Sequence, residues 1–181
     1  AAVSVGRFTL PRNIPHVLRT VGYDIQKDPE IKYGYRFDPI IESLIQKWSP
    51  KISKAVALSE SVKPDLHDIG VASERIEVIP CGVDQTRFDS IQPHRINTRK
   101  KHGIPLNKFV YITVGRNHIK KGFTVLLNAM SEMRRANTLN DIHVVFVGRN
   151  VSNLEARAIE LKINDHVTLV EELGLNPNER E

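Results

Sequence analysis

The chain has 181 residues, of which 40% are hydrophobic, and a formal net charge of +5. Its longest apolar runs span about seven residues, far below the roughly 20 that a membrane-spanning helix needs. Its one cysteine, Cys81, excludes an internal disulfide and favours a reducing compartment, and the positive charge favours an anionic partner such as a nucleotide, a nucleic acid or an anionic lipid surface.

The first half of the chain predicts short strands that alternate with helices. Residues 16–24 indicate a strand that runs into a turn at Gly22. Residues 38–49 indicate a helix with one apolar face, made of Ile40, Ile41, Leu44, Ile45 and Trp48. The pattern then predicts a buried strand at 54–59, a helix from Ser59 to Ile69 that Gly70 ends, and a strand at 75–80.

Residues 85–108 are polar and interrupted by Pro93, Gly103 and Pro105. We interpret this segment as the connection between two α/β units, with a short basic helix at 94–102. The predicted boundaries are residues 1–88 for the first unit, 89–107 for the linker and 108–181 for the second unit.

The second unit predicts three apolar strands and two amphipathic helices. The strands are expected at 109–115, 142–148 and 166–170, and the helices at 123–136 and 153–162. In the first of these helices the inward residues are Phe123, Leu126, Leu127, Met130 and Met133. Continuous apolar strands that alternate with helices indicate a parallel sheet, so the predicted fold class is α/β.

The segment VGRNHIKKGF, residues 114–123, predicts a site for phosphate. Gly115 ends a strand, and ligands of open parallel sheets bind beyond the carboxyl ends of the strands. Arg116 can hold phosphate oxygens through its planar fork, while Lys121 supplies a point charge. A helix that begins soon afterwards adds unpaired N–H groups. On these ten residues alone, the favoured interpretation is a glycine that only allows a turn, flanked by solvated cations.

A longer ordered pattern resembles the family 4 retaining glycosyltransferases. It comprises VALSESVKPDLHDIGVASERIEVIPCGVDQTRF, then YITVGRNHIKKGFTVLLNAM, VVFVGRN and DHVTLV, and it runs from about residue 54 to residue 170. The resemblance implies the GT-B architecture, in which two Rossmann-like domains with parallel sheets bind an acceptor and a nucleotide-sugar donor. The chain would then hold the carboxyl-terminal part of the acceptor-side domain and the amino-terminal part of the donor domain.

The resemblance assigns roles to individual residues. Arg116 and Lys121 match the pair that binds the donor diphosphate and stabilises the leaving group. Gly115 matches a glycine that lets the backbone approach the ligand closely. Gly148 matches the glycine that lines the nucleotide pocket. Glu172 and Leu173 fall where the family contacts the nucleobase. The turn at 80–84 matches a segment near the domain junction.

The chain also departs from the family pattern. Cys81 stands where the family has asparagine, and we interpret it as a buried structural cysteine. Val21 stands where a histidine usually faces the reacting sugar, and Glu171 replaces a glycine. Glu171 and Glu179 have the spacing of the family's Glu-x7-Glu signature, but we reject this match because the pair directly follows the third strand. We therefore expect the chain to be an incomplete and inactive portion of an enzyme.

Other candidate sites are weaker. No His-x3-His, Cys-x2-Cys or His-Glu-x2-His grouping occurs, so we predict no metal site. His118 could touch a ligand, but a solvent-facing loop position is favoured. The basic run 99–102 is interpreted as a solvated helix face, because no aromatic residues interleave it to stack bases. Asp24 could hold a sugar hydroxyl or only shape its turn.

The predicted function is metal-independent transfer of a hexose, with retention, from a nucleotide-diphosphate sugar to a glycan, lipid or small-molecule acceptor. No cofactor is expected besides this donor substrate, and nucleic acid is not an expected partner. The alternative is a non-catalytic nucleotide-sugar-binding or interaction module. No charged-then-apolar leader is visible, although the chain opens without an initiator methionine. The predicted location is the cytoplasm, with contact at the inner face of a membrane left open.

Overall fold

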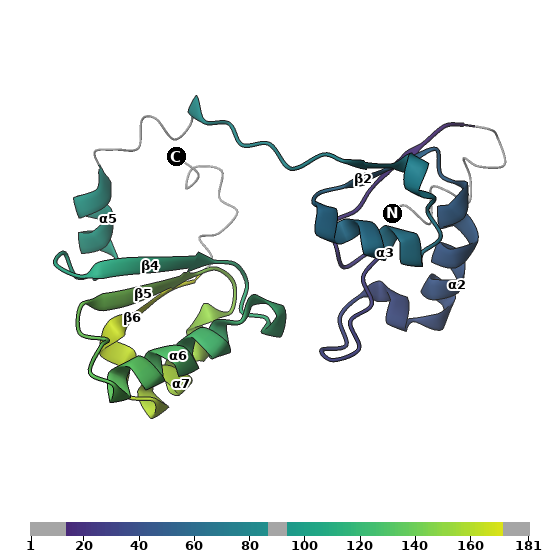
Figure 1. Cartoon of the computed structure of the whole chain (residues 1–181). Helices are drawn as coiled ribbons and strands as arrows, with labels where there is room; N and C mark the ends of the chain where they lie inside the picture. The colour runs from purple at the N-terminus through teal and green to yellow at the C-terminus, as the bar shows by residue number, and fades with distance from the viewer. Residues whose placement is uncertain (1–13, 87–93, 172–181) are drawn as a thin grey trace. The chain divides into compact units, whose positions relative to one another are not determined.

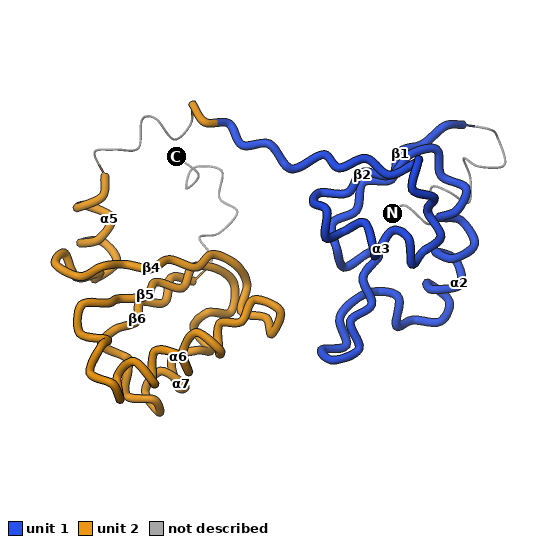
Figure 2. Tube along the Cα trace, viewed as in Figure 1, with its two compact units in different colours: residues 1–84 blue, residues 85–181 orange. Residues whose placement is uncertain are grey.

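The computed structural model describes residues 14–86 and 94–171, which belong to two compact units (Figures 1 and 2). The first unit comprises residues 1–84 and the second residues 85–181. Each unit contains one three-stranded sheet whose strands are all parallel. The predicted α/β class with parallel sheets is therefore confirmed.

The sheet of the first unit has the order β1-β2-β3. Its elements, in chain order, are β1 (Val17–Arg19), η2 (Tyr35–Phe37), α2 (Pro39–Trp48), η3 (Ser49–Lys51), β2 (Lys54–Ala57), η4 (Glu60–Val62), α3 (Lys63–Asp68), η5 (Ser73–Arg75) and β3 (Ile76–Val78). Here η marks a 3-10 helix. Every strand and helix predicted for this half is present.

The core of the first unit lies between its sheet and its helices. It consists of Leu18, Ile25, Ile45, Ile52, Ala55, Ala57, Leu66, Ile69 and Val71. Helix α2 begins where Asp38 accepts hydrogen bonds from the N–H groups of Ile40 and Ile41, at 2.8 and 3.1 Å. Ile40, which belongs to the predicted apolar face, occupies this first turn and is 73% exposed.

A buried arginine fixes the long loop before α2. Arg36 is only 4% exposed, and its guanidinium forms a two-pronged ion pair with Glu42 at 2.7 and 2.9 Å. It also donates to the carbonyl of Ile25 and pairs with Asp68 in α3 at 2.7 Å. The bond from Arg36 lowers the pKa of the Glu42 carboxyl. One side chain thus joins the loop to two helices.

The sheet of the second unit has the order β4-β5-β6. Its elements are α5 (Arg95–Lys101), β4 (Phe109–Val114), η7 (Ile119–Lys121), α6 (Phe123–Arg135), β5 (Ile142–Val147), η8 (Val151–Leu154), α7 (Glu155–Glu160), η9 (Asn164–His166) and β6 (Val167–Val170). Helices α6 and α7 lie along the same face of the sheet (Figure 1).

The predicted inward face of α6 is confirmed. Phe123, Leu127 and Met130 are buried, and Leu126 and Met133 pack against the same cluster. The cluster also contains Leu139, Val144, Phe146, Val151, Leu154, Ala158 and Ile163. It anchors both the start of α6 and the turn after β5, which are the two segments that border the candidate site.

Strand β4 is more exposed than its apolar sequence predicts. Phe109, Ile112 and Val114 are each more than 60% exposed. Among the described strands, β4 pairs only with β5, so it forms an edge of this sheet. An apolar run indicates that a strand can be buried on both faces, but burial also requires elements that cover it.

Cys81 is exposed, so the prediction of a buried structural cysteine is wrong. The residue follows β3 in a segment without regular structure, residues 79–84. Its sulfur accepts a hydrogen bond from Nη2 of Arg19, at 3.2 Å, and this contact connects the segment to the end of β1. The apolar character of cysteine favours burial, but none of the elements that the structure describes covers this side chain.

Candidate functional site

The carboxyl ends of the three strands in the second unit lie in register. Val114 pairs with Val147, and Val147 pairs with Val170. The next residue of each strand therefore lies in one row, made of Gly115, Gly148 and Glu171. Because ligands of open parallel sheets bind beyond this edge, the row marks the candidate site.

The two glycine turns of this row pack backbone against backbone. A Cβ atom on Gly148 would lie 2.2 Å from the carbonyl oxygen of Gly115, closer than any side chain can approach. The N–H of Gly115 donates to Val147, and the N–H of Asn117 donates to the carbonyl of Arg149, both at 2.8 Å. The turn after β4 therefore rests directly on the turn after β5.

Lys121 and Gly115 meet as the sequence predicts. The side chain of Lys121 crosses the glycine, so that its Cε would lie 3.4 Å from a Cβ on Gly115. Arg116 and Lys121 are both exposed. No carboxylate among residues 14–86 and 94–171 pairs with either cation. The carboxyl edge of the sheet therefore carries two positively charged side chains next to Gly115.

Helix α6 begins beside these cations without a side-chain cap. Its N-cap is Gly122, in the left-handed conformation, and its first turn contains no acidic residue. The first N–H groups of a 13-residue helix and its dipole thus favour an anion at this end. His118 caps the preceding turn, because its Nδ1 accepts from the N–H of Lys120 at 3.2 Å.

The third position of the row holds an acid that the sequence does not connect with the other two. The carboxylate of Glu171 accepts hydrogen bonds from the backbone N–H groups of Asn150 and of Ser152, the latter at 3.0 Å. These bonds, first that from Ser152 and then that from Asn150, lower the pKa of the Glu171 carboxyl. Sequence reasoning noted the replacement of a glycine here but not these contacts.

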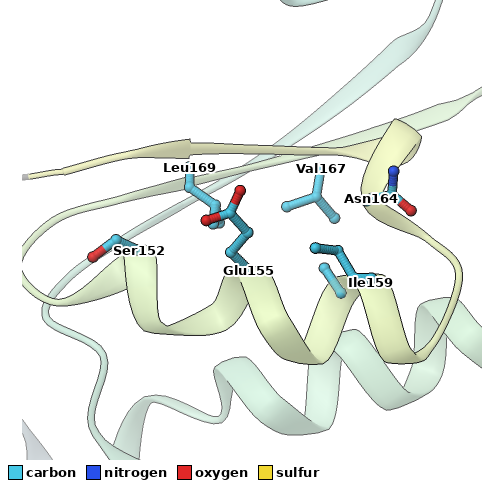
Figure 3. Close-up of a pocket in the computed structure, with 7 residues that line it drawn as sticks. Ser152, Glu155, Ile159, Asn164, Val167 and Leu169 are labelled. Atoms are coloured by element: carbon cyan, nitrogen blue, oxygen red, sulfur yellow. The ribbon is translucent and has the colours of Figure 1, made fainter.

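A cavity of about 410 Å³ lies elsewhere in the unit, between η8–α7 and β6. It is lined by Ser152, Glu155, Ala158, Ile159, Asn164, Val167 and Leu169. Figure 3 shows Glu155 projecting from α7 toward β6, with apolar side chains beside it. The lining contains a carboxylate and no cation, so this cavity does not suit a diphosphate. None of the predicted site residues that the structure describes lines it.

The remaining predicted positions have mixed outcomes. Glu172 and Leu173, and Glu179 of the rejected pair, lie outside the described residues. Val21 is 68% exposed, and its N–H donates to Oδ1 of Asp24 at 3.0 Å, so Asp24 shapes the turn.

The basic run at 99–102 is not wholly a solvated face. Arg99 donates to the carbonyls of Pro105, Leu106 and Lys108, and these bonds hold the connection to β4.

Two further observations concern metal ligands and membrane-spanning helices. Among residues 14–86 and 94–171, no three His, Cys, Asp or Glu side chains converge as metal ligands would. Within the same residues, no helix has the length and apolar character required to cross a bilayer.

Two family models match the chain, one on each half. Residues 5–87 match Glycosyltransferase Family 4, and residues 94–177 match Glycosyl transferases group 1. Over 105 residues the chain is 30% identical to the D-inositol 3-phosphate glycosyltransferase of Corynebacterium kroppenstedtii. This alignment covers 58% of the chain and 22% of that relative.

Solved structures of other proteins have the same fold. HepE from Anabaena, in complex with UDP-glucose, matches 96% of the chain with a TM-score of 0.72 and 19% identity. WaaG, a glycosyltransferase involved in lipopolysaccharide biosynthesis, matches 87% with a TM-score of 0.63 and 18% identity. The chain covers 46% of each of these two proteins, so it spans about half of their length. The predicted GT-B fold class, with parts of two Rossmann-like domains, is confirmed.

Proposed function

We propose that this chain, whose two halves match Glycosyltransferase Family 4 and Glycosyl transferases group 1, binds the diphosphate of a nucleotide-sugar donor with its second unit. The observation that carries the proposal is the meeting of Arg116, Lys121 and the uncapped start of α6 at one sheet edge. The activity itself is assigned to a longer protein, of which this chain would be an inactive portion.

The chemistry assigned to the two cations is electrostatic. When a donor loses its sugar, negative charge develops on the leaving diphosphate. Arg116 would share that charge through two parallel hydrogen bonds, and Lys121 would add a point charge. Cations fixed before the reaction stabilise a developing charge without rearrangement. We infer that these residues supply the required positive charge without a metal, and that the transferred group is a hexose, with retention.

The partners of the longer protein follow from the same proposal. HepE binds UDP-glucose, which supports a nucleotide-sugar donor for this chain and leaves its base and sugar to experiment. The acceptor is proposed to be a glycan, a lipid or a small molecule. The proposed location is the cytoplasm or the inner face of a membrane. No role is proposed for nucleic acid.

Isothermal titration of the 181-residue chain with UDP, GDP and ADP tests the site. We expect one nucleotide to bind, and binding to be lost when Arg116→Ala and Lys121→Ala are combined. The control combines Arg134→Ala at the far end of α6 with Lys100→Ala in α5, which removes the same charge from exposed positions. Equal loss in both double variants would indicate only a general effect of charge and would contradict the proposed site.

The alternative of a non-catalytic binding module is favoured by one observation, the exposed Val21 at the position where the family has histidine. A module would bind the nucleotide but transfer no sugar. In the longer protein, an active enzyme should lose turnover by about two to three orders of magnitude with Arg116→Ala. A longer protein that binds the donor and forms no product would favour the module.

A further inference from the structure

We propose that Glu171 is a positioning residue for the diphosphate site, because its carboxylate holds the turn after β5 on which the turn with Arg116 rests. This inference depends on the function proposed above.

The contacts form a continuous path across the strand ends. The Glu171 carboxylate binds the N–H groups of Asn150 and Ser152. The backbone carbonyl of the neighbouring Arg149 accepts a hydrogen bond from the N–H of Asn117, at 2.8 Å. Asn117 directly follows Arg116. The residue after β6 thereby holds the turn after β5, and the turn after β5 in its place holds the turn after β4.

The physical reason for an acid at this position is the shape of the turn. Asn150 has a left-handed conformation, with φ of 63°, and the 3-10 helix η8 begins directly after it. Successive N–H groups in such a turn point into one concavity, which attracts an anion. The chain supplies this anion itself. A carboxylate in this place forms stronger hydrogen bonds than a neutral group would.

Charge alone and positioning predict opposite effects for removal of this acid. A negative charge near a site for diphosphate repels the ligand, so neutralising Glu171 should strengthen binding if only charge matters. If Glu171 holds the turn, neutralising it should weaken binding instead. Glu155→Gln provides a matched control, because Glu155 is an exposed acid in the adjoining α7 and its replacement removes the same charge.

The first experiment needs no ligand. Amide hydrogen exchange of the 181-residue chain is followed by NMR in the wild type and in Glu171→Gln, Glu171→Ala and Glu155→Gln. We expect exchange at Asn117 to rise about tenfold in Glu171→Ala and less in Glu171→Gln, which keeps one acceptor oxygen. Exchange at the Gly115 N–H, which bonds to Val147, should stay unchanged. Unchanged exchange at Asn117 in both variants would overturn the proposal.

The second experiment measures affinity for the nucleotide that the wild type binds. We expect Glu171→Gln to weaken binding about tenfold, equivalent to about 1.4 kcal/mol, while Glu155→Gln leaves it equal or slightly stronger. Unchanged or tighter binding in Glu171→Gln would overturn the positioning role. If the folded wild type binds no nucleotide, the proposed function and the positioning role both fail. The exchange data then still show whether Glu171 holds the turn.

Discussion

Replacement of Gly148 by alanine tests the backbone contact on which the site depends. The added Cβ would lie 2.2 Å from the oxygen and 2.6 Å from the carbon of the Gly115 carbonyl. These are backbone atoms of a residue whose N–H is bonded to β5, so they cannot move aside freely. Overpacking costs about 1–3 kcal/mol, and a φ of 137° adds about 1–3 kcal/mol for alanine. The expected loss of unfolding free energy is therefore roughly 2–6 kcal/mol.

Gly103 provides a control that has a positive φ but lacks the backbone contact. Gly103 also has a positive φ, of 65°, but a Cβ added there would meet nothing within 4 Å. Gly103→Ala should therefore cost only about 1–2 kcal/mol. Urea unfolding, followed through the amide signals of β5, measures both variants in the same unit. Equal destabilisation of the two variants would show that the glycine turns do not pack as described.

Three further predictions concern buried and unpaired charges. Arg36→Ala should destabilise the first unit by roughly 3 kcal/mol, whereas Lys54→Ala, which breaks an exposed pair, should cost under about 1 kcal/mol; urea unfolding followed by tryptophan fluorescence compares them. Burial lowers the pKa of His143 to about 4. As the pH falls, the unfolded chain therefore takes up a proton at this residue before the folded chain does, and the second unit should lose roughly 3 kcal/mol of unfolding free energy between about pH 6.5 and pH 4. Urea midpoints across this range should depend less on pH in His143→Leu. Finally, Arg116→Gln combined with Lys121→Met should leave the nucleotide-free chain at least as stable as the wild type in urea; a loss above about 1 kcal/mol would assign these cations a structural role.

The sequence predicts those parts of the fold that depend on local pattern. The spacing of Phe123, Leu127 and Met130 determines which face of α6 is buried, because these residues recur with the helical period. The proximity of Gly115 and Lys121 is also predictable, since a strand end and the following helix start must lie close together. Such features require only neighbours along the chain.

Features that depend on distant neighbours escape this reasoning. Cys81 and Ile40 have apolar side chains that suit a core, but both are exposed, because no element within residues 14–86 and 94–171 covers them. The bonds of Glu171 join a side chain to N–H groups about 20 residues earlier, and only the register of β5 and β6 brings them together. The pairing of β5 with β6 could have indicated this contact, because it places the residue after β6 beside the turn after β5.

The positions of Arg116 and Lys121 are better explained by ligand binding than by stability. In the unfolded chain Arg116 and Lys121 are well hydrated and free to separate. Folding lays the Lys121 side chain across Gly115, the neighbour of Arg116, and places Lys121 directly before α6. A positive charge at the positive end of a helix costs about 0.3–1 kcal/mol. A chain selected only for stability would place an acid in the first turn of α6, as it does beside the turn after β5 with Glu171. The absence of an acid from that first turn keeps the positive potential available, and a bound diphosphate would convert the cost into affinity.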